Sequence, residues 1–503
     1  MSLANTYSRS QDGIHAPLVS VEVDLANGLP SFSIVGLPET AVKESRDRVR
    51  AAIVNSRFEF PARRITVSLA PADLPKDGGR FDLPIALGIL AASKQIPAET
   101  LGQYEFAGEL GLSGEIRAVR GLLPMALACR QAGRALVVPA DNADEATLVG
   151  GVEVLPAGHL LTVCAHLTGE ARIVPHHTEL PDMDIASDLD IADVRGQHHA
   201  KRALEIAAAG QHNLLMIGPP GTGKTMLASR LASILPPLTE DEAIETAAVA
   251  SIGDTGFDIR YWKRRPVRCP HHTASGVALV GGGSHPRPGE ISLSHNGVLF
   301  LDELTEFDRR VLEVLREPIE TGRITISRAA RQAEFPARFQ LVAAMNPCPQ
   351  GYDCDLGEHC RCTPEQQRRH RARISAPLLD RIDLQIEVLR PPREAQDNEA
   401  RDTSAAIRAR VLAARERQLA RAGKPNAQLN NRELERDCAL DEKDATLLQD
   451  AIRRFGLSMR AEHRILKVAR TIADLAGNEH VTTEHVTEAL TYRAMDRWLG
   501  RQR

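Results

Sequence analysis

The sequence predicts a mixed α/β protein in three parts, and three observations support that prediction. A phosphate-binding loop motif begins at Gly218, directly after a short apolar strand. Short apolar strands alternate with helices over residues 186–395, which is typical of a mostly parallel sheet covered by helices. Residues 396–503 carry apolar side chains at helical spacing, which predicts a helical domain. Residues 1–185 are expected to form a separate, smaller α/β domain.

Composition narrows the functional classes. The chain has 503 residues, of which 43% are apolar and 25% charged, and its formal net charge is −4. These values exclude a strongly basic nucleic-acid coat, so any DNA contact must come from local clusters. No run approaches the roughly 18 apolar residues that a membrane helix needs, and the amino-terminal residues lack the apolar core of a signal peptide. With eight cysteines spread over the chain, we expect a cytoplasmic protein without a membrane partner.

The first domain is predicted from alternating and helical patterns. Apolar residues alternate over 19–25 and 65–69, which predicts two half-buried strands. Asn27-Gly28 predicts a hairpin turn into a strand near Phe32. Helical stretches are expected at 38–56, 81–94 and 124–132, and a buried strand at 134–138. Residues 175–192 are expected to form an acidic linker.

A nucleotide site is predicted in the central domain. The motif G-x-x-x-x-G-K-[ST] is complete and consists of Gly218, Pro219, Pro220, Gly221, Thr222, Gly223, Lys224 and Thr225. It lies between an apolar strand, 214–217, and a helical stretch, 226–235. Glycines let backbone N–H groups surround phosphates, and a helix amino terminus adds positive potential. We expect Lys224 to reach the terminal phosphates of ATP and Thr225 to bind Mg²⁺.

A second apolar strand ends in two carboxylates. Residues 298–301 are wholly apolar, and Asp302 and Glu303 follow them. Asp302 is expected to hold Mg²⁺, and Glu303 to polarise the water that attacks the γ-phosphate. Asn346 follows a further apolar strand, 340–344, where its amide could orient that water or contact the γ-phosphate.

The order of these motifs resembles that of the AAA+ ATPases, in particular their magnesium-chelatase-like and MCM-helicase branch. The resemblance implies that Asn346 is the first sensor and that Arg381, in Leu378-Leu-Asp-Arg-Ile-Asp383, is an arginine finger. It also implies that Arg460 is the second sensor, with Arg464 one turn later as the alternative. A finger acts on the nucleotide of a neighbouring subunit, so the resemblance implies a homo-hexameric ring.

Two segments are candidates for DNA contact. Residues 261–289 contain no acidic residue, include Tyr261 and Trp262 for base stacking, and carry four proposed phosphate ligands: Lys263, Arg264, Arg265 and Arg268. Adjacent His271 and His272 would point to opposite sides of an extended chain, which argues against a shared metal. Residues 323–338 resemble the hairpin that precedes the first sensor in the MCM and chelatase branch. There, Arg328 and Arg331 near the tip would grip a phosphate backbone.

Four cysteines lie close together in sequence after the first-sensor strand: Cys348, Cys354, Cys360 and Cys362. Four thiolates could form a tetrahedral Zn²⁺ site. Their spacing differs from the common C-x₂-C pairs, so free thiols on a loop are an equal alternative.

Residues 36–56 and 69–92 resemble the amino-terminal domain of the ComM (YifB) family, a domain similar to the Lon protease catalytic fold. Arg80 and Phe81 stand where the Lon-type Ser is expected, so we expect no peptidase activity. The resemblance extends over nearly the whole chain. It implies an ATP-driven DNA helicase for branch migration in homologous recombination and natural transformation. The alternatives are a magnesium-chelatase-like remodelling subunit and an ATP-gated DNA clamp or loader.

Overall fold

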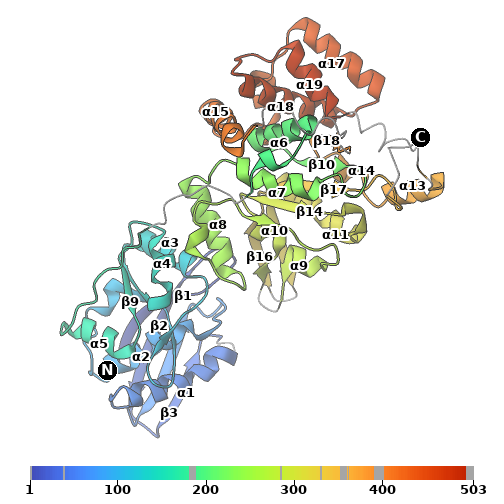
Figure 1. Cartoon of the computed structure of the whole chain (residues 1–503). Coiled ribbons are helices and arrows are strands. Elements are labelled where there is room, and N and C mark those ends of the chain that lie inside the picture. The colour runs from blue at the N-terminus through green and yellow to red at the C-terminus, as the bar shows by residue number, and fades with distance from the viewer. Residues whose placement is uncertain are drawn as a thin grey trace. The chain divides into compact units, whose positions relative to one another are not determined.

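The computed structural model forms two compact units (Figure 1). It describes residues 3–37, 40–179, 189–283, 286–328, 331–351, 360, 362–389 and 402–493. The first unit consists of Met1–Asp182, Glu240–Trp262 and Ser327–Phe335, and the second consists of Met183–Thr239, Lys263–Ile326 and Pro336–Arg503. The second unit thus holds most of the predicted central domain together with the helical part, and the three-domain division stays a prediction.

The first unit contains a mixed four-stranded sheet in the order β1-β2-β4-β3. Its strands are β1 (Leu3–Arg9), β2 (Leu18–Ala26), β3 (Ser31–Val35) and β4 (Arg64–Ala70). The predicted alternation is observed, because Val19, Val21 and Val23 are fully buried. The hairpin predicted at Asn27-Gly28 is wrong, since β3 does not pair with β2 but runs parallel to β4. The turn leads the chain past β2 to the far side of β4.

Helices α1 (Thr40–Asn55) and α2 (Asp82–Ala92) pack against each other, and α2 also packs on β1 and β2. A three-stranded parallel sheet, in the order β5-β8-β9, continues this unit. Its strands are β5 (Tyr104–Phe106), β8 (Ala135–Pro139) and β9 (Val154–Ala157), and its helices are α3 (Leu122–Ala132), α4 (Ala143–Thr147) and α5 (Leu160–Thr168). A short hairpin joins β6 (Glu109–Leu110) to β7 (Ile116–Arg117).

Helix α8 (Glu240–Ile252) comes from the predicted central domain but belongs to the first unit. It packs against α3, and the backbone N–H of Gly121 donates to the carbonyl of Ser251 at 3.1 Å. Arg120 forms an ion pair with Asp254 at 3.1 Å just beyond the helix. The sequence patterns described above predicted neither this helix nor the core that it joins.

The second unit is built on a five-stranded parallel sheet in the order β11-β14-β17-β10-β18. The strands are β10 (Leu214–Ile217), β11 (Val267–Arg268), β14 (Val298–Leu301), β17 (Gln340–Met345) and β18 (Leu384–Glu387). Neighbouring strands are not consecutive along the chain, so each connection crosses over through helices, as the alternating pattern predicted.

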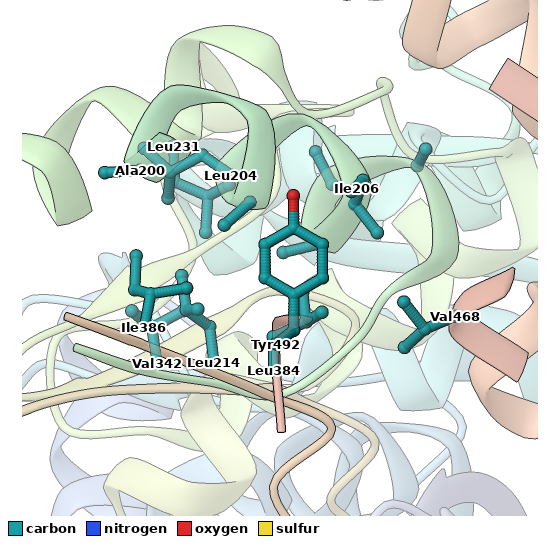
Figure 2. Close-up of a cluster of buried hydrophobic side chains, with 14 of the residues drawn as sticks. Ala200, Leu204, Ile206, Leu214, Leu231, Val342, Leu384, Ile386, Val468 and Tyr492 are labelled. Carbon is teal, nitrogen blue, oxygen red and sulfur yellow. The ribbon is translucent and has the colours of Figure 1, made fainter. Parts of the chain in front are cut away.

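Helices α6 (His198–Gly210), α7 (Lys224–Ile234), α15 (Ser404–Ala422) and α18 (Met459–Ala476) share one apolar core with this sheet. Figure 2 shows Tyr492 within that core, together with strand residues such as Leu214 and Ile386 and helix residues such as Leu204 and Val468. Tyr492 is 1% exposed. The core therefore joins the sheet and the carboxy-terminal helices into one body.

The remaining elements of the second unit are short helices and hairpins around the sheet, and further carboxy-terminal helices. The helices are α9 (Gly276–Val280), α10 (Glu290–Leu293), α11 (Arg309–Val314), α12 (Arg316–Thr321), α13 (Pro364–Arg371), α14 (Ala376–Leu379), α16 (Asn431–Asp437), α17 (Glu442–Phe455) and α19 (Thr483–Thr491). Strand β12 (Gly281–Gly282) pairs with β13 (Arg287–Pro288). Strand β15 (Arg323–Arg328) pairs with β16 (Arg331–Pro336), and Ser327–Phe335 of this hairpin is assigned to the first unit. The predicted fold class, a mixed α/β protein with a parallel sheet and a helical carboxy-terminal part, is confirmed. Within the described ranges, no helix has both the length and the apolar character that crossing a bilayer requires.

Candidate functional site

The phosphate-binding loop connects β10 to α7 at the carboxyl edge of the parallel sheet. Gly221 and Gly223 have positive φ angles of 76° and 90°, a conformation that glycine adopts without strain. A Cβ atom at Gly218 would lie 2.2 Å from the carbonyl oxygen of Val388, so this glycine permits a close backbone approach. The loop then enters α7 at Lys224, which places a helix amino terminus where phosphates would bind.

Lys224 is buried and directed at its own loop. Its Nζ donates to the carbonyls of Gly218 at 2.7 Å and Pro219 at 2.9 Å, and to Oδ1 of Asn346 at 3.1 Å. Burial lowers the pKa of Lys224, and the nearby carboxylates of Asp302 and Glu303 oppose that shift. The ammonium group therefore lies in the loop that a nucleotide would occupy, held by neutral acceptors.

Thr225 and Asp302 form a direct pair. The Thr225 hydroxyl donates to Oδ2 of Asp302 at 2.6 Å, and Oδ1 of Asp302 accepts from the backbone N–H of Glu303 at 2.9 Å. These oxygens are hard ligands of the kind that Mg²⁺ takes from protein when phosphates and water complete its octahedron. The donor set therefore fits the metal ion that the sequence predicted.

Glu303 has an unusual backbone. Its φ angle is 52°, in the left-handed region that costs a side-chain-bearing residue roughly 1–3 kcal/mol. Its carbonyl accepts from the N–H of Glu306 at 2.7 Å, and its Oε2 lies 3.2 Å from Nδ1 of His272. Strained residues of this kind concentrate at functional sites.

Asn346 follows the last residue of β17, the strand next to β10. Besides the Lys224 contact, its backbone carbonyl interacts with Nε2 of His370 on α13 at 3.0 Å. Burial lowers the pKa of His370. The predicted first-sensor residue is thus fixed between the phosphate-binding loop and α13.

Arg381 lies away from these residues, between α12 and α14. Its guanidinium donates to the carbonyls of Pro377 at 2.6 Å and Arg316 at 3.2 Å, and pairs with Glu320 at 2.5 Å. The side chain is 8% exposed. A finger that acts on a neighbouring subunit need not approach its own loop, but this one would have to leave Glu320.

The two candidates for a second sensor differ in their surroundings. Arg460 is exposed at the beginning of α18. Arg464 pairs with Asp383, which also accepts from the backbone N–H of Asn213 at 2.9 Å. Burial favours a higher pKa for Asp383, but Arg464 and the other partners lower it below the ordinary carboxyl range. Arg464 is therefore committed to a buried ion pair, which favours Arg460.

The predicted DNA contacts are only partly accessible. Trp262 is 4% exposed and packs edge-on against Phe257, so the expectation that it stacks on bases is corrected, whereas Tyr261 is 60% exposed. Arg265 donates to the carbonyls of Pro236, Pro237 and Asn296, which indicates a structural role. Lys263 is half-buried and Arg264 exposed.

Arg268 forms a bidentate pair with Glu290, at 2.6 and 2.7 Å, and stays 41% exposed. The side chains of Arg328 and Arg331 lie outside the described part of the chain, although the backbone of both belongs to the β15–β16 hairpin. His271 and His272 were expected to point apart, but their ring centroids are 4.1 Å apart because the chain turns there.

Three of the four clustered cysteines come together. The sulfur atoms of Cys348, Cys360 and Cys362 lie within 4.8 Å of one another, while Cys354 falls outside the described residues. Burial and the neighbouring thiols raise the pKa of Cys362 to about 11. The backbone N–H of Gly351 donates to the Cys348 sulfur at 3.3 Å.

Comparisons with known proteins agree with this architecture. Residues 190–396 match the family described as magnesium chelatase, subunit ChlI, residues 21–142 match subunit ChlI of Mg-chelatase, and residues 401–493 match its carboxy-terminal family.

Some similar proteins match the whole length of this chain, and others match only part of it. Competence protein ComM of Haemophilus influenzae is 55% identical, with 99% of each chain covered. The uncharacterized protein YifB of Escherichia coli is 51% identical over 99% of this chain and 98% of its own. The magnesium-chelatase 38 kDa subunit of Rhodobacter capsulatus is 28% identical over 59% of this chain and 85% of its own. The chain therefore belongs to the ComM/YifB family of magnesium-chelatase-like AAA+ proteins.

Proposed function

We propose that this protein is a DNA-dependent ATPase whose cycle moves branched DNA, as in branch migration during homologous recombination and natural transformation. The observation that carries the ATPase part is the convergence at one sheet edge of Lys224, Asn346 and the Thr225–Asp302 pair. The DNA part is supported by the basic segment after Tyr261 and by a relative whose name is competence protein ComM.

In the proposed reaction, each group has a separate role. Lys224 exchanges its two carbonyl acceptors for phosphate oxygens when ATP enters the loop. Thr225 and Asp302 would hold Mg²⁺, which would supply charge neutralisation to the phosphates. Glu303 orients and deprotonates the attacking water, and Asn346 stays beside Lys224 to contact the γ-phosphate.

The working assembly is proposed to be a homo-hexameric ring in the cytoplasm. Arg381 would act in trans as the arginine finger after its separation from Glu320, and Arg460 would serve as the second sensor. Each would add positive charge where the transferred phosphoryl group develops negative charge. A neighbouring subunit would be needed for that role, because Arg381 makes its contacts on α12 and α14 of its own chain.

DNA contacts are proposed at Lys263, Arg264, Arg268, Arg328 and Arg331, which would bind the phosphate backbone. Arg268 would exchange Glu290 for a phosphate. We omit Arg265 from this set, because its guanidinium is used on three backbone carbonyls.

We also propose that Cys348, Cys360 and Cys362 bind Zn²⁺. Three sulfur ligands at mutual distances within 4.8 Å, two of them on buried cysteines, match the preference of zinc for thiolates. Cys348 and Gly351 lie within five residues after Asn346, so a bound ion would stabilise the chain beside the nucleotide site. Whether Cys354 supplies the fourth ligand is a prediction from sequence alone.

A chelatase-like remodelling activity is the second candidate, favoured by the similarity to the magnesium-chelatase 38 kDa subunit over 59% of the chain. An ATP-gated clamp or loader is the third.

The experiment that tests the DNA-dependent ATPase measures ATP hydrolysis by the wild type, Lys224→Ala and Glu303→Gln, with and without a synthetic forked DNA. The proposal expects DNA to raise the wild-type rate and both variants to be inactive. Equal wild-type rates with and without forked DNA would contradict it.

A further inference from the structure

A cavity of about 430 Å³ lies at the amino edge of the five-stranded sheet, at the opposite edge from the phosphate-binding loop. Three residues that line it, Asn213, Phe339 and Asp383, each directly precede a parallel strand, namely β10, β17 and β18. Side chains of α12 and α18 complete the walls, and every lining residue belongs to the second unit. The volume falls in the range of roughly 300–1,000 Å³ that is typical of small-molecule sites.

The two carboxylates that line the cavity are already neutralised by arginines of the same unit. Glu320 pairs with Arg381 at 2.5 Å, and the buried Asp383 pairs with Arg464. Neither carboxylate is therefore left to balance any further positive charge in the lining.

Two more cations line the same cavity, Arg338 and Lys467. In the part of the chain that the structure describes, neither forms an ion pair with a carboxylate. Nζ of Lys467 donates to the carbonyl of Ala427 at 3.0 Å, a neutral acceptor, and burial lowers the pKa of this lysine. Arg338 lies over Gly322, where a Cβ atom would be 2.7 Å from its Cγ, so the glycine makes room for the arginine. The cavity thus holds two positive charges that the protein itself does not compensate.

The charge and the other lining groups indicate the class of ligand. A phosphate monoester carries a charge of about −1.5 to −2 at neutral pH and offers three acceptor oxygens, which matches two cations. A carboxylate or a DNA phosphodiester supplies only one negative charge. The amides of Gln211, Asn213 and Gln428 can bond to hydroxyl groups of such a ligand, and Phe339 and Leu429 offer apolar surface to its carbon atoms.

We propose that this cavity binds a small phosphate monoester, with Arg338 and Lys467 as the ligands of its phosphoryl group. Lys467 exchanges the carbonyl of Ala427 for a phosphate oxygen, and the exposed Arg338 donates two parallel hydrogen bonds to the same group. The site is separate from the proposed nucleotide site, which lies at the carboxyl edge of the sheet.

The test is isothermal titration calorimetry of the full-length protein with inorganic phosphate. All proteins carry Lys224→Ala, which weakens phosphate binding at the nucleotide loop, and they are compared with and without Arg338→Gln, Lys467→Met or Lys443→Gln. We expect Arg338→Gln and Lys467→Met each to weaken the affinity by roughly ten-fold, because each removes a charged donor. Lys443→Gln is the matched control on the exposed surface of α17 and should leave the affinity unchanged.

Unchanged phosphate affinity in Arg338→Gln and Lys467→Met overturns the proposal. Arg338 is exposed, so its replacement tests the site even if the change at Lys467 disturbs the fold. Acetate, with a single charge, should bind at least ten-fold more weakly than phosphate, and equal affinities would overturn the assignment to a monoester. Glycerol 3-phosphate should compete with phosphate. Competition by an unphosphorylated oligonucleotide without competition by glycerol 3-phosphate would overturn the proposal in favour of a DNA backbone.

Discussion

The ammonium group of Lys224 lies 3.1 Å from the side-chain oxygen of Asn346, although these residues are 122 positions apart. Parallel pairing explains the contact, because Ile217 at the end of β10 is opposite Met345 at the end of β17. Residues that follow the two strands therefore emerge side by side. An incoming γ-phosphate would meet a lysine and an amide that already form one unit.

Removal of the Lys224 ammonium is expected to abolish productive ATP binding. Lys224→Ala should lower kcat/KM for ATP by at least about 100-fold, because electrostatic stabilisation of the transferred phosphoryl group is lost. The measurement is steady-state ATP hydrolysis with purified protein. Lys443→Ala, at an exposed position of α17, is the control and should match wild type. Equal activity of both variants would contradict the assignment.

The Thr225–Asp302 pair predicts a specific magnesium defect. Asp302→Asn should raise the Mg²⁺ concentration that gives half-maximal hydrolysis by about ten-fold, because a neutral amide holds the ion and its water shell less well. The titration is run at saturating ATP. Asp308→Asn, which changes a carboxylate that caps α11, is the matched control and should leave the magnesium dependence unchanged.

Because Arg464 pairs with the buried Asp383 and Arg460 is exposed, replacing these two sensor candidates should have different effects on the stability of the fold. Arg464→Ala leaves a buried carboxylate without its main cation and should lower the free energy of unfolding by about 3 kcal/mol at pH 7. Arg460→Ala changes an exposed side chain and should stay within roughly 0.5 kcal/mol of wild type. Denaturant unfolding measures both.

The pH dependence of the same pair follows from the sign of the shift. The folded protein lowers the pKa of Asp383, so the unfolded chain takes up the proton first as pH falls. The stabilisation is complete at neutral pH and declines once pH falls below about 4, the ordinary pKa of an aspartate. The difference between wild type and Arg464→Ala should therefore narrow between pH 7 and pH 3. A constant difference would contradict the ion-pair explanation.

The cysteine cluster predicts one bound zinc ion for each chain. Metal analysis of purified wild type should find it, and Cys348→Ser or Cys362→Ser should reduce the content by removing a ligand. Cys438→Ser is the matched control, because Cys438 is a buried cysteine that packs with Leu429 and Leu434. Wild-type protein without metal would end the zinc proposal.

Much of the fold was predictable because the signals are local. The alternation over residues 19–25 and the wholly apolar strands before Lys224 and Asp302 identify elements regardless of their partners. The pairing of β3 with β4 was missed because a turn dipeptide marks a change of direction and not the strand that follows as neighbour. The placement of α8 in the first unit likewise depends on distant residues.

At the candidate site, too, the contacts that follow from local sequence signals were predictable, and those that depend on distant residues were not. Parallel strands share a carboxyl edge, so the meeting of Lys224, Asp302 and Asn346 follows from their positions after apolar strands. The contact between His272 and Glu303 and the burial of Trp262 depend on how a loop folds. The basic, acid-free run over residues 261–289 marked this loop as a candidate for function, but sequence spacing suggested the wrong geometry for its histidine pair.

The central claim is that ATP hydrolysis by this chain moves branched DNA. The most direct measurement follows strand exchange in a synthetic four-way junction with wild type, Glu303→Gln and the double variant Arg328→Ala/Arg331→Ala. The account predicts ATP-dependent migration by wild type, none by Glu303→Gln, and hydrolysis without migration in the double variant. Wild-type protein that hydrolyses ATP at full rate on the junction yet leaves its branch point in place would contradict the account.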